Sequence, residues 1–151
     1  MDVIVRPATS NDIAAISRVV IAALRESNSQ DYSPDLIAEV ERSFSPESVG
    51  ALLHKRKVFV AWLGGNITGT ASLDGAVVRS VFVDPAYQGA GIGRQLMAVI
   101  HATAAQVGVG VLRVPSSITA ERFYAALGYQ KIRDEFHGNE RTVVMEKQLA
   151  G

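Results

Sequence analysis

The sequence contains no cysteine, no net charge and no long apolar run. The absence of cysteine excludes disulfide bonds, thiolate metal ligands and a covalent cysteine intermediate. Lys+Arg 15 and Asp+Glu 15 cancel, so no basic excess suggests a nucleic-acid partner. No apolar run reaches the roughly 18 residues that a membrane span needs, so we expect no membrane partner. The opening Met1-Asp2-Val3 lacks the regions of a secretion signal, and a cytoplasmic location is expected.

What is present suits one domain over residues 1–151. The chain is 48% hydrophobic and 20% charged, and this length can bury a single core. No internal repeat or linker interrupts it. The three histidines, His54, His101 and His137, lack the spacing of metal ligands and have no cluster of carboxylates beside them, so no metal site is predicted.

The most informative stretch is residues 77–97. An apolar strand pattern over 77–83 breaks at Asp84-Pro85, glycines recur at Gly89, Gly91 and Gly93, and a helical pattern follows at once. A strand, a glycine loop and a helix together turn backbone N–H groups toward an anion, and the helix dipole adds positive charge there. The stretch therefore predicts a cradle for a pyrophosphate.

Two common phosphate loops do not fit this stretch. The loop of nucleotide hydrolases needs Gly-Lys-Ser/Thr, whereas Arg94 and Gln95 follow Gly93 here. A Rossmann loop needs GxGxxG and an acidic residue at the end of the next strand, where this chain has Arg113-Val114-Pro115.

A third pattern, Q/R-x-x-G-x-G/A, matches at Gln88, Gly91 and Gly93. It is the acetyl-CoA signature of the GNAT superfamily of N-acetyltransferases, which this chain resembles. A second stretch, residues 116–129 (SSITAERFYAALGY), is similar to the family's later motif. The opening residues 3–13 also resemble the family's first strand and helix. The likeness covers nearly the whole chain, and it is to small bacterial single-domain members.

The resemblance implies a binding site for acetyl-CoA as co-substrate, without a metal. Backbone groups at Val81 and Val83 would hold the pantetheine arm and the thioester oxygen. Ser117 stands where many relatives carry an asparagine that contacts this arm, although a serine there could instead cap a helix. The implied cofactor-binding residues are Val81, Phe82, Val83, Gln88, Gly89, Ala90, Gly91, Ile92, Gly93, Arg94, Ser117 and Phe123.

The same resemblance makes Tyr124 the catalytic residue. The leaving group is the thiolate of CoA, and thiols and tyrosines have reference pKa values of about 8.5 and 10. Full proton transfer from an unperturbed tyrosine is thus uphill by roughly 2 kcal/mol. Tyr124 would stabilise the thiolate by hydrogen bonding, with or without complete transfer.

A general base and an acceptor site are less well marked. Relatives that acetylate lysine in histones carry a glutamate at the position of Val77, so deprotonation through ordered water is the expectation here. The polar residues near this position are Asp74, Arg79 and Ser80. Candidates for substrate binding by position are Tyr32, Arg79 and His137, with Asp31 and Trp62.

The element order β-α-α-β-β-β-α-β-α-β-β is the order of the GNAT family. It implies an α+β fold with a mixed, mostly antiparallel seven-stranded sheet flanked by helices. The serine–proline pair at 45–46 signals a further short helix. A strand at 111–114 is expected to lead into a helix over residues 117–127.

The function expected from these motifs is N-acetyl transfer from acetyl-CoA by direct attack of a primary amine, on a small molecule or an exposed protein amine. Two alternatives remain open. One is an acyltransferase that uses another acyl-CoA or an acceptor other than an amine. The other is a non-catalytic acyl-CoA-binding regulatory domain. The sequence leaves a homodimer open and does not identify the acceptor.

Overall fold

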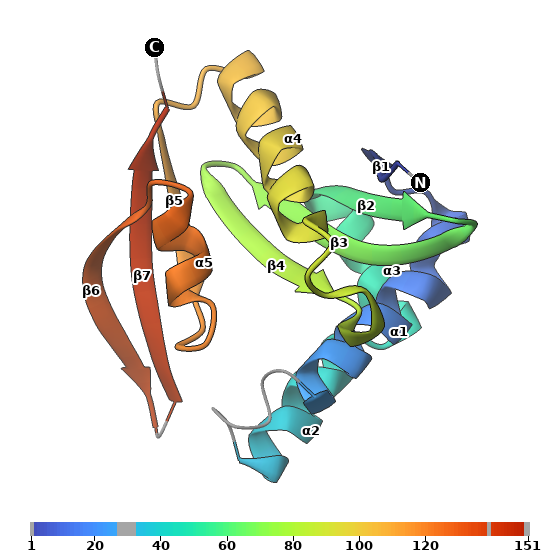
Figure 1. Ribbon diagram of the computed structural model, residues 1–151. Helices are drawn as coiled ribbons and strands as arrows, with labels where there is room; N and C mark the ends of the chain where they lie inside the picture. Colours follow the sequence, from blue (N-terminus) through green and yellow to red (C-terminus); the bar gives the residue numbers. More distant parts are fainter. Residues whose placement is uncertain (1, 27–32, 139, 150–151) are drawn as a thin grey trace.

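A seven-stranded sheet runs through the computed structural model, which describes residues 2–26, 33–138 and 140–149 (Figure 1). The strand order is β1-β2-β3-β4-β5-β7-β6. Only β4 and β5 pair in parallel, so the sheet is mixed and mostly antiparallel, as predicted. The strands are β1 (Ile4–Pro7), β2 (Lys57–Leu63), β3 (Asn66–Asp74), β4 (Val77–Val83), β5 (Val111–Ser116), β6 (Gln130–His137) and β7 (Glu140–Gln148).

In the described part of the chain, five α-helices and two short 3-10 helices connect the strands. They are η1 (Ser10–Asp12), α1 (Ile13–Glu26), α2 (Pro34–Arg42), α3 (Pro46–Lys55), η2 (Pro85–Tyr87), α4 (Ile92–Gln106) and α5 (Glu121–Ala126). Ser33 and Ser45 cap α2 and α3, each hydroxyl accepting a bond from a backbone N–H three residues on. A proline follows each cap, where its missing N–H costs no helical bond. None of these helices, within the described residues, is long and apolar enough to span a membrane.

Two parts of the chain differ from the expected order. The described part of the connection from β1 to β2 holds three α-helices after η1, because the short helix signalled at residues 45–46 is added to the two of the family order. Helix α5 begins at Glu121 rather than at residue 117. The Ser117 hydroxyl accepts a bond from the Ala120 N–H at 3.2 Å, so residues 117–120 form a capped turn ahead of the helix.

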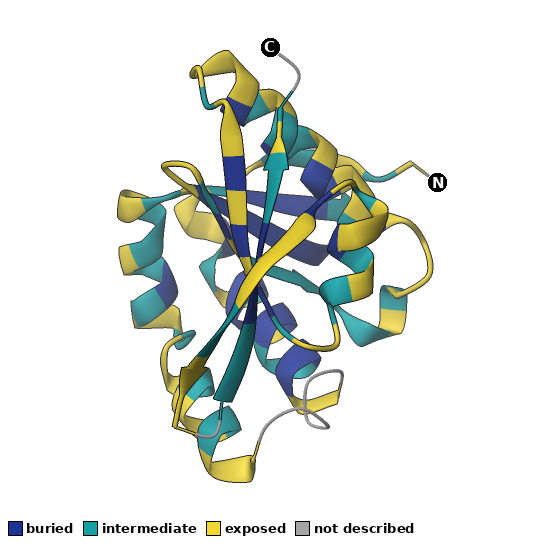
Figure 2. Cartoon of the chain, turned by 90° about the vertical axis from the view of Figure 1, so that its left-hand side faces the viewer, coloured by how far each residue is buried: buried dark blue, intermediate teal, exposed yellow. Residues whose placement is uncertain are grey.

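The core lies on both faces of the sheet. Phe59 and Ala61 of β2 point to the face covered by α4, and Val60 between them points to the face covered by α1 and α3. This alternation is the period-two pattern of a strand. Figure 2 shows the result, with dark, buried segments gathered in the central strands and on the inner sides of the helices.

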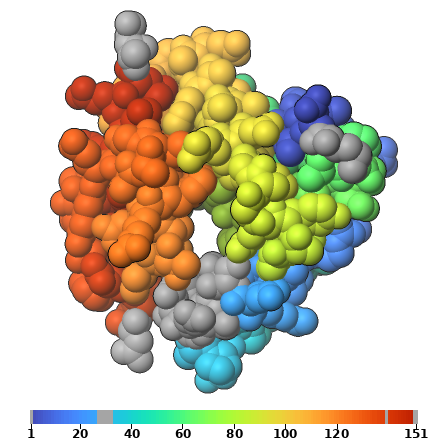
Figure 3. Space-filling view, in the orientation of Figure 1, coloured from blue at the N-terminus to red at the C-terminus, as the bar shows by residue number. Residues whose placement is uncertain are grey.

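The sheet opens between β4 and β5. Their register contains one pair, Val77 with Arg113, supported by a bond from the Arg113 N–H to the Ala76 carbonyl at 3.0 Å. Beyond Val77 the two strands diverge, which Figure 1 shows as a V between β4 and the β5–β7–β6 unit. The space-filling view shows a hollow between the segment near residue 120 and the yellow-green segment after β4 (Figure 3). This divergence creates the site.

Candidate functional site

One wall of the site is β4, and a β-bulge shapes it. The register with β3 shifts so that Ala71 stands opposite two residues, Ser80 and Val81. Ser80 has φ 55°, a positive value that is uncommon for a residue other than glycine. A bulge bends its strand and re-aims the backbone groups that follow. From Ser80 onward, β4 has a strand partner only on the β3 side within the described residues, so backbone groups on its other edge face the opening.

The glycine loop follows directly at the end of β4. Gly89 has φ 84° and Gly91 has φ 76°, and Gly91 is the N-cap of α4. No side chain caps this helix, and its first bond runs from the Gln95 N–H to the Gly91 carbonyl. The N–H groups of the first helical turn are therefore free of helical partners and point out of the helix end. Such an end favours an anion.

Gly93 serves a different purpose from the other two. Its φ is not positive, and a β-carbon there would lie 3.1 Å from Cζ and 3.2 Å from Cε1 of Phe123. The residue is a glycine because the first turn of α4 packs against the Phe123 ring of α5. Arg94 is exposed on the next position of the helix, where an arginine opposes the helix dipole.

Two cavities meet beside this loop. A smaller one of about 190 Å³ is lined by residues of β4, the glycine loop and α5, among them Val83, Gln88, Gly93 and Phe123. A larger one of about 570 Å³ continues from it toward the β6–β7 hairpin. Five residues line both: Val81, Phe82, Ser117, Ala120 and Tyr124. The site is thus a two-ended passage with Tyr124 at its middle.

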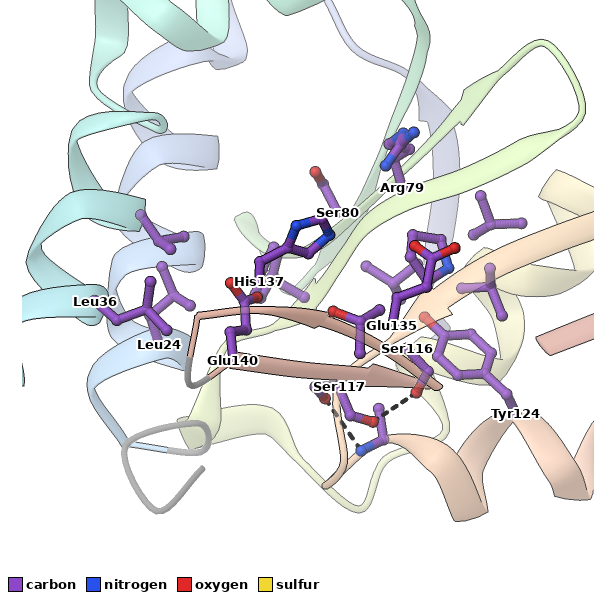
Figure 4. A pocket seen from close by; sticks show the side chains of 18 of the residues that line it. Leu24, Leu36, Arg79, Ser80, Ser116, Ser117, Tyr124, Glu135, His137 and Glu140 are labelled. Carbon is purple, nitrogen blue, oxygen red and sulfur yellow. Dashed lines mark hydrogen bonds between the residues drawn. The ribbon is translucent and has the colours of Figure 1, made fainter. Parts of the chain in front are cut away.

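Tyr124 is held by rings and faces this passage. Only 5% of the residue is exposed, and its ring makes edge contacts with Phe123 and Tyr129 at centroid distances of 5.1 and 5.5 Å. Figure 4 shows its hydroxyl directed into the cavity, where no described residue hydrogen-bonds it. Burial, with a smaller effect of Tyr129, raises the pKa of the Tyr124 hydroxyl. Tyr124 is therefore a protonated hydrogen-bond donor aimed at the passage.

The substrate-binding candidates fare differently. Arg79 and His137 both line the larger cavity, from β4 and β6. Tyr32 and Asp31 lie outside the described residues. Trp62 does not line the cavity: it packs against the apolar cluster under α1, because its position on β2 points to that face.

Sequence reasoning missed three charged residues of the larger cavity, Arg56, Glu135 and Glu140. Arg56 follows the last turn of α3, and its guanidinium donates to the Ser80 hydroxyl at 3.1 Å. The two glutamates belong to the hairpin opposite β4 (Figure 4). Leu24, Leu36 and Val40 of α1 and α2 supply an apolar wall. Among the residues that the structure describes, no group of three or more His, Cys, Asp or Glu side chains could hold a metal ion.

Comparison with solved structures shows the fold in other proteins. A GCN5-related N-acetyltransferase from Rhodopseudomonas palustris superposes with a TM-score of 0.91 and 24% identity, over 99% of this chain and 97% of that one. The PaiA N-acetyltransferase of Thermoplasma acidophilum, solved with coenzyme A, gives 0.86 and 17%, over 98% and 99%. YncA of Salmonella typhimurium, solved with its cofactor acetyl-CoA, gives 0.71 and 23%, over 100% and 96%.

The sequence itself places the chain in a family. No curated protein matches it significantly. The sequence model of the family described as "Acetyltransferase (GNAT) domain" matches residues 28–149. This range includes β4, which lines both cavities, the glycine loop that follows it, and helix α5, which carries Tyr124. With this match over most of its length, the chain belongs to the GNAT family of acetyltransferases.

Proposed function

We propose that this chain, as one domain over residues 1–151, transfers the acetyl group of acetyl-CoA to a primary amine. The observation that carries the proposal is the passage between β4 and β5, which runs from an uncapped helix end to a charged cavity, with a hydroxyl donor at its middle. A long, phosphate-bearing thioester fits one end of this passage, and a separate acceptor fits the other.

The residues suited to CoA lie along the smaller cavity. The backbone around Gly89, Gly91 and the first turn of α4 would hold the pyrophosphate, with Arg94 beside it. Open backbone groups of Val81 and Val83 would hold the pantetheine arm and the thioester carbonyl. Gln88, Phe82, Phe123 and Ser117 line the same cavity, while Ala90 and Ile92 complete the loop. Ser117 already accepts a bond from the Ala120 N–H, and its second lone pair stays available to a ligand.

The reaction on this geometry is a direct displacement. The amine nitrogen attacks the thioester carbon, a C–N bond forms, the C–S bond breaks, and the sulfur leaves as a thiolate that takes up a proton. Backbone N–H groups of β4 stabilise the carbonyl oxygen as negative charge develops on it. Tyr124 donates a hydrogen bond to the departing sulfur. Positioning of the two reactants supplies much of the rate.

Deprotonation of the amine is assigned to ordered water. Position 77 is a valine, and Glu135 is engaged by Arg133 at 2.7 Å. An amine with a pKa near 10.4 is only about one part in 2,500 neutral at pH 7, so some route for its proton is needed. Single changes of Asp74, Ser80, Glu135 and His137 should each keep the acidic limb of the pH–rate profile, where the rate falls as a general base becomes protonated. A variant that loses this limb while still binding both substrates would reveal a dedicated base.

The test is release of free CoA thiol in the presence of acetyl-CoA and a panel of amines, with calorimetry of acetyl-CoA binding beside it. Gly91→Asp adds a negative charge and strain at the helix end, and should abolish acetyl-CoA binding while circular dichroism stays unchanged. Unchanged affinity in that variant contradicts the assigned pyrophosphate site. Tight binding without turnover on any amine would favour the regulatory-domain alternative.

A further inference from the structure

The β4 wall of the larger cavity carries more positive than negative charge. Arg56 and Arg79 both line the cavity. Both approach the same oxygen of Asp74, at 3.9 and 4.0 Å, which is the outer limit of an ion pair. The single negative charge of Asp74 thus lies near two positively charged guanidinium groups. The Asp74 side chain is 49% exposed and does not line the cavity, whereas the Arg56 side chain is only 18% exposed.

Arg56 is fixed in place and has donors to spare. It emerges at the end of α3, and one nitrogen donates to the Ser80 hydroxyl at the bulge. A guanidinium carries five N–H donors, so most of them remain available after that bond. Burial, reinforced by the neighbouring Arg79, lowers the pKa of Arg56, as expected where positive charge is incompletely compensated. The fork geometry of guanidinium matches a carboxylate or phosphate.

Among the described residues, neither glutamate of the opposite wall, Glu135 or Glu140, forms an ion pair with Arg56 or Arg79. Glu135 on β6 is already engaged by Arg133, with nitrogens at 2.7 and 2.9 Å from its carboxylate. Glu140 and His137 lie where the hairpin turns (Figure 4). The third side of the cavity is aliphatic, formed by Leu24, Leu36 and Val40. The cavity therefore offers an oxyanion site beside β4, and its apolar side lies away from Arg79 (Figure 4).

We propose that the acceptor is an amine that also carries an oxyanion, specifically a carboxylate, bound by Arg56 and Arg79. This inference rests on the proposed function and names its substrate class. Arg79 precedes Val81 by two residues, and because the bulge at Ser80 lies between them, this spans at most about 7 Å along the strand. Several bonds must thus separate the carboxylate from an amine that reacts beside Val81 and Tyr124, which favours ω-amino carboxylates.

The test compares acceptors of equal length that differ in their far end: 6-aminohexanoate, hexylamine and 1,6-diaminohexane, at saturating acetyl-CoA. We expect kcat/KM to be highest for 6-aminohexanoate. Arg79→Gln should lower that value about 10- to 100-fold, the range for losing a hydrogen bond between charged groups, and change hexylamine less than about 3-fold. Arg56→Lys, which keeps the charge and loses the fork, should lower it as well. Arg113→Gln is the matched control, since Arg113 pairs with Glu146 on β7 and does not line the cavity.

Equal kcat/KM values for the three amines would overturn the inference, because the site would then not recognise the far end of the acceptor. A preference for the diamine would also overturn it and would indicate a site for cationic acceptors. A higher value for 3-aminopropylphosphonate than for 4-aminobutyrate would keep the oxyanion site and replace the carboxylate by a phosphate-type group. If no amine is acetylated, calorimetry of 6-aminohexanoate against the CoA-loaded protein separates the two proposals. Binding that Arg79→Gln abolishes supports the anion site and rejects transfer; no binding rejects the anion site.

Discussion

At Tyr124, burial acts on the same proton that the proposed mechanism uses. Burial disfavours the phenolate, and the pKa of Tyr124 is raised above its ordinary value. The hydroxyl therefore keeps its proton throughout the range in which enzymes are assayed, and the role we propose for it is a donated hydrogen bond rather than a titration. The edge contacts with Phe123 and Tyr129 hold the ring in a direction that points this donor into the passage.

Tyr124→Phe removes the hydroxyl and keeps the ring. We expect turnover to fall roughly 10²- to 10⁴-fold, the span for loss of a group that assists proton transfer, while acetyl-CoA affinity changes little. Because Tyr124 stays protonated, the ratio of variant to wild-type kcat should be the same at pH 6, 7.5 and 9. A ratio that changes steeply over this range would show that the tyrosine titrates, and an unchanged kcat with chemistry rate-limiting would make it a packing residue.

The absence of a side chain at Gly93 leaves room for the Phe123 ring beside the first turn of α4. A β-carbon at this position would come within 3.1–3.2 Å of the Phe123 ring, and Phe123 in turn contacts Tyr124. Gly93→Ala should displace the Phe123 ring by a few tenths of an ångström, and lower both acetyl-CoA affinity and kcat. The double change Gly93→Ala with Phe123→Leu should restore part of the affinity.

The control for that experiment is Gly110→Ala, whose β-carbon meets no atom within 4 Å and whose φ is not positive. It should leave affinity and kcat as in the wild type. If Phe123→Leu fails to improve the Gly93→Ala variant, the steric account of Gly93 is wrong, and its role lies in contact with the ligand.

At the scale of an element, the bulge of β4 predicts which of two Ser80 variants has the larger free energy of unfolding. A residue at φ 55° is strained unless it is glycine, whereas glycine in a regular strand is less stable than alanine. We expect Ser80→Gly to be more stable than Ser80→Ala by about 1 kcal/mol, because both lose the bond from Arg56 and only glycine relieves the backbone. Urea denaturation measures the difference. A more stable alanine variant would place Ser80 in a regular strand and remove the bulge.

Helices and strands that are marked by neighbouring residues in the sequence could be predicted. Features that depend on how one strand pairs with another could not. The bounds of β4 were predicted as found, since it is a short apolar run that ends at Asp84-Pro85. The start of α3 followed from the serine–proline pair at 45–46. The bulge at Ser80 has no local signal, because it exists only as two residues opposite one on β3. Glu135 and Glu140 were missed because the splay of β4 from β5 decides which hairpin faces the cavity. Arg56 was missed because only the folded chain brings the end of α3 beside the bulge at Ser80.

At the scale of the whole molecule, the sheet is two units joined at a narrow seam. β4 and β5 share one registered pair, so contacts away from the strands must help to hold the units together. His101 provides one of them. It lies on α4, which packs over β2 and β3, and its Nε2 is 2.8 Å from the hydroxyl of Tyr129, which precedes β6 in the other unit. The two rings are 5.8 Å apart.

This contact makes the seam sensitive to acid. Burial, with a smaller effect of Lys147, lowers the pKa of His101 in the folded protein, while in the unfolded chain it is near 6.5. Between these two values the unfolded chain binds more protons, so the free energy of unfolding falls as the pH falls. The stabilising effect of the neutral imidazole is complete above about pH 6.5, and it is lost progressively as the pH drops toward the lowered folded-state pKa.

His101→Gln should remove this acid-sensitive contribution. At pH 7.5 the variant loses a neutral hydrogen bond of about 1 kcal/mol, and for a chain of this size Tm should fall by about 3 °C. Between pH 7.5 and 5.5, Tm should then decline less in the variant than in the wild type, because groups common to both chains cancel in the comparison. His54→Gln, at an exposed position on α3, is the matched control and should follow the wild type at both pH values. An equal decline for His101→Gln and wild type would mean that the acid sensitivity of the seam arises elsewhere.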